Sequence, residues 1–384
     1  MKSLLQPAFK LPNSRHAYRV NITLDDTVAE GWRRVMHDYF CESTSLIYTC
    51  PPAEVEKKAF FNDNGFRIWR KPGDYGHGLE DCAILGGVAL SMLCDQFLAT
   101  GNRSLADDAR KIACGLINLA TVHGVKGFIA RGICVEDGKS VCALSSIDQH
   151  THAVHGLWRY GRSGLNDGSL NAEIKRVLSE VADRMTAQVI EANDWSFLQA
   201  TGTGPTRGIT KMRFNLPHEG MRLSMIYAAA AAVTDNQDYR DLYLKYRDEG
   251  LENSMRPLLA WSPDYTLLQM QTSLELVLAE ERDDDAKVRI LAAMRQPADV
   301  AAEHALKLGT ADSQYLCGAG ECQLAQLMAP NRPYAAEQQD ILLKAIAAQP
   351  FSTTASCCRI LHLSAAWWRL RTLIARNTIF SVTD

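Results

Sequence analysis

The segment Ala83-Ile-Leu-Gly-Gly-Val-Ala89 is apolar on every side and rich in small residues. A helix with so little polar surface is expected to be buried all round rather than along one stripe. The segment Tyr227-Ala-Ala-Ala-Ala-Ala-Val233 has the same character. The segment 172–192, in contrast, carries acidic and basic residues along one face, which predicts a solvated helix. The sequence therefore predicts inner helices that alternate with outer ones.

Apolar residues recur with a helical period over much of the chain, whereas the alternation typical of strands is scarce. The short connections Thr100-Gly-Asn102 and Thr234-Asp-Asn236 carry helix stop and start signals, so they predict antiparallel hairpins. We expect about a dozen helices, over residues 27–39, 78–99, 104–123, 147–162, 172–192, 217–233, 239–249, 265–280, 286–294, 298–308, 313–328, 335–348 and 355–375.

The chain has 384 residues, which exceeds the usual size of a single hydrophobic core. Apolar residues make up 47% of it and charged residues 22%, which is ordinary for a globular protein with a large core. No Pro/Ser/Gly-rich stretch, run of like charge or low-complexity segment marks a domain boundary. The sequence therefore predicts one domain over residues 1–384, with an N-terminal extension of about 25 residues.

The formal net charge is −3 and no basic cluster follows one face, which disfavours a nucleic acid or an anionic membrane as a partner. The N-terminal apolar run is too short for a secretory leader, and no later segment is expected to reach the roughly 18 apolar residues of a membrane span. The eleven cysteines are an odd number and fall mostly inside helical patterns, which favours reduced, buried thiols. We expect a cytoplasmic protein; its oligomeric state is left open.

Three long connections, 60–76, 125–146 and 194–216, each lead into a helix, so they are expected to crowd one rim and build a pocket there. At their ends stand the motifs Asp74-Tyr-Gly-His-Gly-Leu-Glu-Asp81, Ser145-Ser-Ile-Asp-Gln-His-Thr-His152 and Leu216-Pro-His-Glu-Gly-Met-Arg222. Their placement resembles the six-hairpin glycosidase-like superfamily, whose (α/α)6 toroids include unsaturated glucuronyl hydrolases, rhamnosidases and several polysaccharide lyases.

The closest local match to that superfamily is Ser145-Ser-Ile-Asp148 followed by Gly156-Leu157. The resemblance implies an all-α fold, an (α/α)6 toroid of helical hairpins. It also implies that Asp148 is the general acid of a glycosidase, since members often carry a catalytic Asp at the start of an inner helix. Within the superfamily, a glucuronidase or glucuronyl hydrolase type is the expectation.

Glycoside hydrolysis needs one carboxylic acid to protonate the leaving oxygen and usually a second carboxylate to activate water or attack the sugar. On a helix that begins near Asp148, the residues Thr151, His152 and His155 share its face. The alternative is that Asp148 only caps the helix and complements its dipole. The carboxylate candidates are Asp148, Glu80, Asp81 and Glu219.

Two further groups show helical spacing. His77 shares a face with Glu80 and Asp81. Arg222 lies one turn beyond His218 and three residues beyond Glu219, so these three form a second group. The alternatives are an acidic first turn that complements a helix dipole, and a salt bridge at a helix start. The predicted catalytic residues are therefore Asp148, Glu219, Asp81, His218, His77 and His152.

An arginine guanidinium matches the carboxylate of a uronic acid bidentately. The resemblance to the glycosidase superfamily, whose glycan clefts are rich in aromatic residues, implies that aromatic side chains also bind the sugar. The predicted substrate-binding residues are Glu80, Trp69, Tyr75, Arg131, Arg213, Arg222 and Gln149. The cluster His150, His152 and His155 and the pair of His77 with Asp81 form no complete ligand set, so no metal and no other cofactor is predicted.

The leading functional prediction is a glycoside hydrolase that removes an acidic sugar from a small carbohydrate or oligosaccharide. Asp148 would be its acid, and Glu219, Glu80 or Asp81 would act on water. A second possibility is a sugar 2-epimerase or a uronate lyase, with His77, His152 or His218 as the base for a carbon-bound proton. A third is a helical scaffold or glycan-binding module without turnover. The sugar, the linkage and the stereochemical course stay open.

Overall fold

A computed structural model of the chain describes residues 23–68, 74–204, 209–258, 262–308 and 356–381. Within these ranges the chain forms ten α-helices and one small sheet, so the prediction of a mostly helical protein is confirmed. The helices are α1 (Thr23–Asp38), α2 (Cys82–Thr100), α3 (Ala106–Thr121), α4 (Ile147–Arg162), α5 (Asn171–Gln188), α6 (Arg222–Thr234), α7 (Gln237–Ser254), α8 (Asp264–Glu280), α9 (Asp284–Leu308) and α12 (Cys357–Ser381).

The sheet consists of β1 (Phe40–Cys41) and β2 (Leu46–Ile47), which pair antiparallel with Phe40 opposite Ile47. Short 3₁₀-helices of three residues lie in the connections, at Pro52–Glu54, Lys58–Phe60, Arg103–Leu105, Glu191–Asn193 and Pro217–Glu219.

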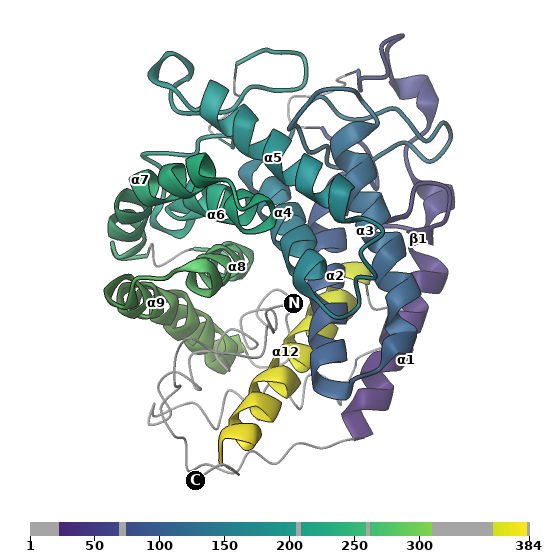
Figure 1. The fold of residues 1–384 in the computed structure, drawn as a ribbon. Helices are drawn as coiled ribbons and strands as arrows, with labels where there is room; N and C mark the ends of the chain where they lie inside the picture. The colour runs from purple at the N-terminus through teal and green to yellow at the C-terminus, as the bar shows by residue number, and fades with distance from the viewer. Residues whose placement is uncertain (1–22, 69–73, 205–208, 259–261, 309–355, 382–384) are drawn as a thin grey trace.

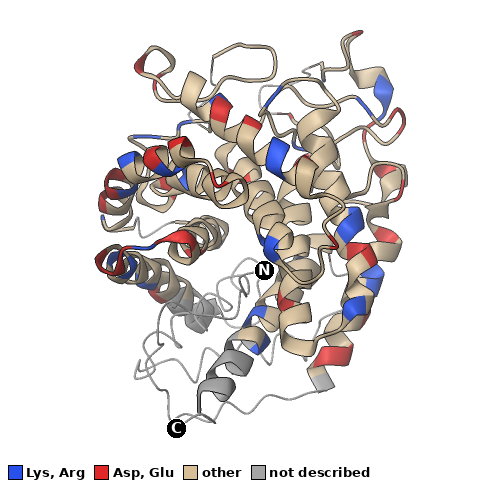
Figure 2. Cartoon of the chain, viewed as in Figure 1, with Lys and Arg blue, Asp and Glu red and all other residues tan. Residues whose placement is uncertain are grey.

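Five helices pack against one another as an inner layer. α12 contacts α2, α2 contacts α4, α4 contacts α6, and α6 contacts α8 (Figure 1). The other five pack outside them: α1 on α12, α3 on α2, α5 and α7 on α6, and α9 on α8. Charged residues gather on outer helices such as α7 and α9, whereas α2 and α6 are nearly free of them (Figure 2). The predicted alternation of inner and outer helices is therefore present in the described residues.

Small residues let α2 and α4 touch backbone to backbone. A Cβ atom added to Gly87 would lie 2.2 Å from the carbonyl oxygen of His152, and one added to Gly156 would lie 2.9 Å from the Cα of Gly87. Real side chains cannot approach so closely, so glycine is required where these helices cross. The apolar, glycine-bearing segment of α2 thus determines how near α4 and its polar residues come.

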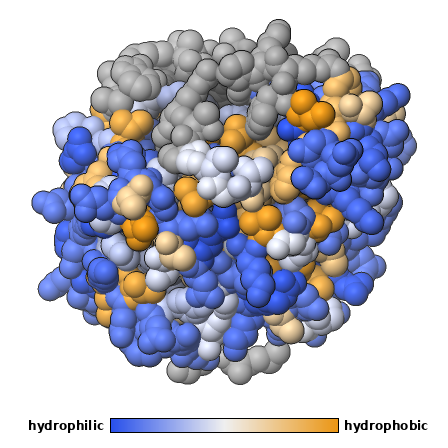
Figure 3. Space-filling model, turned by 90° about the horizontal axis from the view of Figure 1, so that it is seen from above, coloured by the Kyte–Doolittle hydropathy of each residue, from blue (hydrophilic) through white to orange (hydrophobic). Residues whose placement is uncertain are grey.

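α2 is also long and apolar enough to cross a membrane by length and composition, contrary to the prediction that no segment reaches this limit. However, 78% of its most apolar stretch is buried inside the protein, as expected for a core helix. The surface seen in Figure 3 is largely hydrophilic, with hydrophobic residues scattered across it.

The predicted boundaries of α4 are confirmed, but the predicted helices 78–99 and 217–233 begin several residues before α2 and α6 do. α2 starts at Cys82 because Gly76 and Gly78 adopt left-handed φ angles of 97° and 79°, which a helix does not allow. The segment Pro217–Glu219 forms a separate 3₁₀-helix before α6. The helical spacing from His77 to Asp81 therefore does not apply, since these residues precede the helix.

The two helices predicted over 286–294 and 298–308 form the single helix α9, which continues through Pro297. A proline removes one backbone donor and usually kinks or ends a helix, which is why the sequence predicted a break here. The helices predicted over 313–328 and 335–348 lie outside the described residues.

Candidate functional site

Three of the predicted carboxylates come together at the starts of inner helices. Asp81 immediately precedes α2, Asp148 lies in the first turn of α4, and Glu219 ends the 3₁₀-helix before α6. Burial is the main cause of the raised pKa values of Asp81 and Glu219, and the negative charge of Asp148 adds to both. Burial also raises the pKa of Tyr265 on α8, with smaller contributions from all three carboxylates, so the four side chains lie close together. We call Asp81, Asp148 and Glu219 the entry cluster.

Asp148 pairs with a buried arginine on the neighbouring inner helix. Arg222 Nη1 lies 3.4 Å from Asp148 Oδ1 and donates to Thr151 Oγ1 at 2.8 Å. Arg222 Nη2 donates to Gln269 Oε1 at 3.2 Å. The helix cap is Ser146 rather than Asp148, so Asp148 does not act as an N-cap. The predicted common face of Asp148 and Thr151 is confirmed, because one guanidinium group contacts both side chains.

Asp81 is held by side chains from two other segments. Gln149 Nε2 donates to Asp81 Oδ1 at 2.9 Å and to the carbonyl oxygen of Glu80 at 3.0 Å. Arg131 Nη1 lies 3.6 Å from Asp81 Oδ1, and its guanidinium stacks over the ring of Tyr75 at 3.7 Å. Burial raises the pKa of Asp81, and this effect outweighs Arg131 and Gln149, which lower it. The side chain of Asp81 nevertheless stays 42% exposed, so a ligand can reach it.

Glu219 is the least exposed member of the entry cluster, at 19%. Its Oε2 accepts a hydrogen bond from the backbone N–H of Leu216 at 3.1 Å. Burial raises the pKa of Glu219, with a further contribution from Asp148 and against the charge of Arg222. His218 Nε2 lies 3.8 Å from Glu219 Oε1. Burial and the charge of Arg222 lower the pKa of His218 to about 4, so its imidazole is neutral at pH 7.

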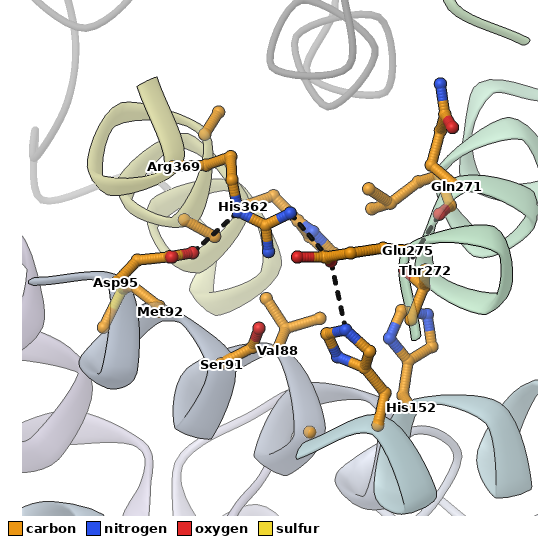
Figure 4. Close-up of a pocket in the computed structure, with 15 residues that line it drawn as sticks. Val88, Ser91, Met92, Asp95, His152, Gln271, Thr272, Glu275, His362 and Arg369 are labelled. Carbon is orange, nitrogen blue, oxygen red and sulfur yellow. Dashed lines mark hydrogen bonds and ion pairs between the residues drawn. The ribbon is translucent and has the colours of Figure 1, made fainter. Parts of the chain in front are cut away.

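His152 lies one turn beyond Asp148 on α4, and it lines a separate cavity of about 60 Å³ between α2, α4, α8 and α12 (Figure 4). That volume suffices for a few water molecules. His362 on α12 lines the same cavity, and burial lowers its pKa to about 4. Burial also lowers the pKa of His152, and charge repulsion from His362 and Arg222 lowers it further. None of the entry-cluster carboxylates lines this cavity.

A closed ring of four ion pairs borders the cavity. Asp95 on α2 pairs with Arg159 on α4, and Arg159 pairs with Glu275 on α8 at 2.9 Å. Arg369 on α12 pairs with Glu275 at 2.8 Å and with Asp95 at 2.8 Å (Figure 4). His155 Nε2 lies 3.1 Å from Glu275 Oε2. We call Asp95, Arg159, Glu275 and Arg369 the ion ring. Two positive and two negative charges balance, so the ring joins four inner helices without a net charge.

Sequence reasoning missed the ion ring and the neighbours of the entry cluster on α8, Tyr265 and Gln269. One signal for the ring was present, since Asp95 is the single charged residue of α2. A charge inside an otherwise apolar helix requires a partner. The sequence does not identify that partner, because it lies on a distant segment.

Several predicted site residues lie elsewhere. Arg213 is bound by Glu249, with 2.9 Å from Nε and 2.6 Å from Nη2, and stacks on Trp195 at 4.2 Å. His150 is not joined to His152 and His155 in one site: its Nδ1 lies 2.9 Å from the carbonyl oxygen of Ser146, and it does not line the cavity that the other two histidines line.

The remaining members of the predicted site lie near the loop before α2. The carboxylate of Glu80 lies 3.5 Å from the hydroxyl of Thr49. His77 is exposed and groups with Cys50 and Glu54. Trp69 lies outside the described residues. The contacts therefore connect Asp81, Asp148, His218 and Glu219 with Arg131, Gln149 and Arg222. His77 groups instead with Cys50 and Glu54, and His152 lines the other cavity.

No protein-family model matches this chain, and no curated protein matches it.

Proposed function

We propose that this protein is a glycoside hydrolase acting on an acidic, uronic acid-containing glycoside, with the entry cluster as its catalytic carboxylates. One observation carries the proposal: Asp81, Asp148 and Glu219 are gathered at the starts of three inner helices, and two of them have raised pKa values. Carboxyl groups with different environments are what a glycosidase needs, because one must donate a proton while another stays ionised.

The surroundings of the three carboxyl groups favour Glu219 as the general acid, the role that the sequence analysis assigned to Asp148. Glu219 is the better proton donor, because burial raises its pKa. Asp148, ion-paired with Arg222, is the better carboxylate for activating water or attacking the sugar. Asp81 has a raised pKa as well and is the alternative donor.

The acidic substrate is proposed from the arginine beside Asp81. Arg131 is fixed against Tyr75, and its buried Nε has no partner among the described residues. A guanidinium group of this kind suits a ligand carboxylate. Tyr265 adds an aromatic ring that is 52% exposed next to the three carboxylates, where a sugar face can stack.

We also propose that the helices complete an (α/α)6 toroid. The alternation of inner and outer helices supports this, as does the pair of Glu275 with Arg369, which links α8 to α12. The ten described helices and the two predicted over 313–328 and 335–348 make twelve, the number that six hairpins require.

The test is turnover of two uronides that differ only in their leaving group, an acidic phenol and an alcohol. We expect Glu219→Gln to lose about 10²- to 10⁴-fold with the alcohol and much less with the phenol, because a good leaving group needs little protonation. Asp148→Asn should lower both rates alike. Glu30→Gln, a change at an exposed glutamate of α1, is the control. If neither uronide is turned over, or if the folded Glu219 and Asp148 variants remain fully active, the proposal fails.

One observation favours a second candidate, a uronate lyase or sugar 2-epimerase. His218 is neutral at pH 7 and adjoins Glu219, so it can accept a carbon-bound proton. A lyase would release an unsaturated product with new ultraviolet absorbance, and its activity would depend on His218 more than on Glu219.

A further inference from the structure

Three potential metal ligands converge outside the entry cluster. Cys50 precedes the 3₁₀-helix Pro52–Glu54, Glu54 ends it, and His77 lies in the loop before α2. The Sγ atom of Cys50, a carboxylate oxygen of Glu54 and an imidazole nitrogen of His77 all lie within 4.8 Å of one another. Cys50 is 9% exposed, while the other two side chains are open to solvent.

The two loops that carry these ligands are held together by the protein itself. The backbone N–H of Glu56 donates to the carbonyl oxygen of His77 at 2.9 Å. A Cβ atom on Gly78 would lie 2.7 Å from Cys50 Sγ, so the absence of a side chain at Gly78 lets the thiol approach the loop. The donors therefore meet because the backbone brings them together, and not because long side chains happen to cross on the surface.

We propose that Cys50, Glu54 and His77 bind a zinc ion. A thiolate, an imidazole and a carboxylate form the mixed sulfur, nitrogen and oxygen set that Zn²⁺ accepts, whereas Mg²⁺ and Ca²⁺ require oxygen ligands. Zinc bond lengths of about 2.0–2.3 Å place tetrahedral ligands about 3.5 Å apart, so small rotations of the exposed Glu54 and His77 side chains complete the site. The thiol proton of Cys50 leaves to solvent as the Zn–S bond forms.

The fourth position of this zinc ion faces water, because two of its three ligands are exposed. The ion would fasten the loop that continues through Glu80 to Asp81 onto the segment before the 3₁₀-helix Pro52–Glu54. It would stabilise the approach to the entry cluster without contacting a substrate. The inference is independent of the proposed hydrolase activity, since neither Cys50 nor Glu54 belongs to the entry cluster.

The experiment is a titration of chelator-treated full-length protein with Zn²⁺ against a chromophoric competitor. We expect one tight site in the wild-type protein, and affinity losses of at least about 100-fold in Cys50→Ser and His77→Gln, beyond the 10- to 100-fold typical of residues behind the ligands. Cys114→Ser and His37→Gln are the matched controls: Cys114 is part-exposed, and His37 is an exposed histidine of α1. A large excess of Mg²⁺ should not compete.

Two further measurements keep the proposal falsifiable if Cys50→Ser folds poorly. Co²⁺ should give a thiolate-to-metal absorption band in the wild-type protein that is kept in the two controls and lost or strongly weakened in His77→Gln, a change at an exposed residue. Zn²⁺ should also raise the Tm of the wild-type protein but not that of Glu54→Gln, because only binding to the folded state stabilises it. Zinc binding that is equally tight in the control, Glu54 and His77 variants would overturn the site, as would no tight binding at all.

Discussion

Neighbouring charges and burial distinguish the three carboxyl groups of the entry cluster. Asp148 pairs with the fully buried guanidinium of Arg222. For Asp81 and Glu219, burial raises the pKa by more than their hydrogen-bond donors and neighbouring arginines lower it. Removal of a carboxylate from water favours its protonated form. The cluster therefore places two carboxyl groups with raised pKa values beside the ion-paired Asp148 within one small region.

The first prediction concerns these proton affinities. In a carboxyl ¹³C NMR titration, Asp81 and Glu219 should titrate above their ordinary values of 3.8 and 4.5. In Asp148→Asn both pKa values should fall, because the negative charge of Asp148 is one cause of each increase. Glu30→Gln should leave them unchanged. Values at or below the ordinary ones in the wild-type protein would contradict the proposed acid.

At the scale of elements, the contact of α2 with α4 determines where the polar residues of α4, among them Asp148 and His152, lie relative to α2. The two backbones approach at Gly87 and Gly156, which leaves no room for a side chain. Gly161, near the end of α4, is different, since an added Cβ would lie 3.6 Å from Ile174, an ordinary packing distance.

The second prediction compares these glycines. Gly87→Ala should lower the free energy of unfolding by about 2–3 kcal/mol or more, because the new methyl group meets the carbonyl oxygen of His152. Gly161→Ala should be neutral or raise it by up to about 1 kcal/mol, since alanine favours the helix and has room. Urea denaturation of both variants measures the difference. Equal effects would mean that the helices do not cross so closely.

For the whole molecule, the ion ring joins α2, α4, α8 and α12 beside the cavity that His152 lines. Burial raises the pKa of Glu275, but Arg369 and Arg159, with a hydrogen bond to His155, hold it well below its usual range. A carboxyl group whose pKa is depressed by folding stabilises the protein above its unfolded pKa and loses that contribution as pH falls toward the folded pKa. The ring should therefore make the fold sensitive to acid.

The third prediction follows from the lowered pKa of Glu275. The free energy of unfolding should fall as the pH drops below about 4.5, the ordinary pKa of glutamate. Glu275→Gln should be less stable at pH 7, but by less than the roughly 3–5 kcal/mol of a buried charge left unpaired, because Arg159 and Arg369 each lose one carboxylate partner and keep Asp95. It should then lose less further stability on acidification than the wild-type protein. Denaturant curves at several pH values test this, and parallel curves would exclude Glu275 as an acid-sensitive group.

The fourth prediction concerns the cysteines of the whole chain. All nine that lie in the described residues are free, and seven of them are buried. Thiol titration in denaturant without reductant should count eleven, and the native protein should react with far fewer. Several disulfides in the purified protein would contradict both the reduced state and the expected cytoplasmic location, which stays a prediction.

The sequence by itself determined the helical class, the division into apolar and amphipathic helices, and the position of Asp148 in the first turn of α4. These features are local, because the period of apolar residues and the start signals of a helix lie within one segment. Two predictions of this local kind were wrong. α2 begins later than predicted, because Gly76 and Gly78 adopt left-handed φ angles, and α9 continues through Pro297, where the sequence predicted a break.

Only the tertiary structure decided which polar groups meet. Arg222 and Asp148 are 74 residues apart, and Arg369 and Asp95 are 274 apart. Cys50 and His77 come from two loops whose contact no spacing predicts. A helical period specifies which face of a helix is buried, but the neighbour of that face depends on how all helices pack. Close contacts such as Gly87 on His152 decide that packing, and with it the composition of the entry cluster, the ion ring and the proposed zinc site.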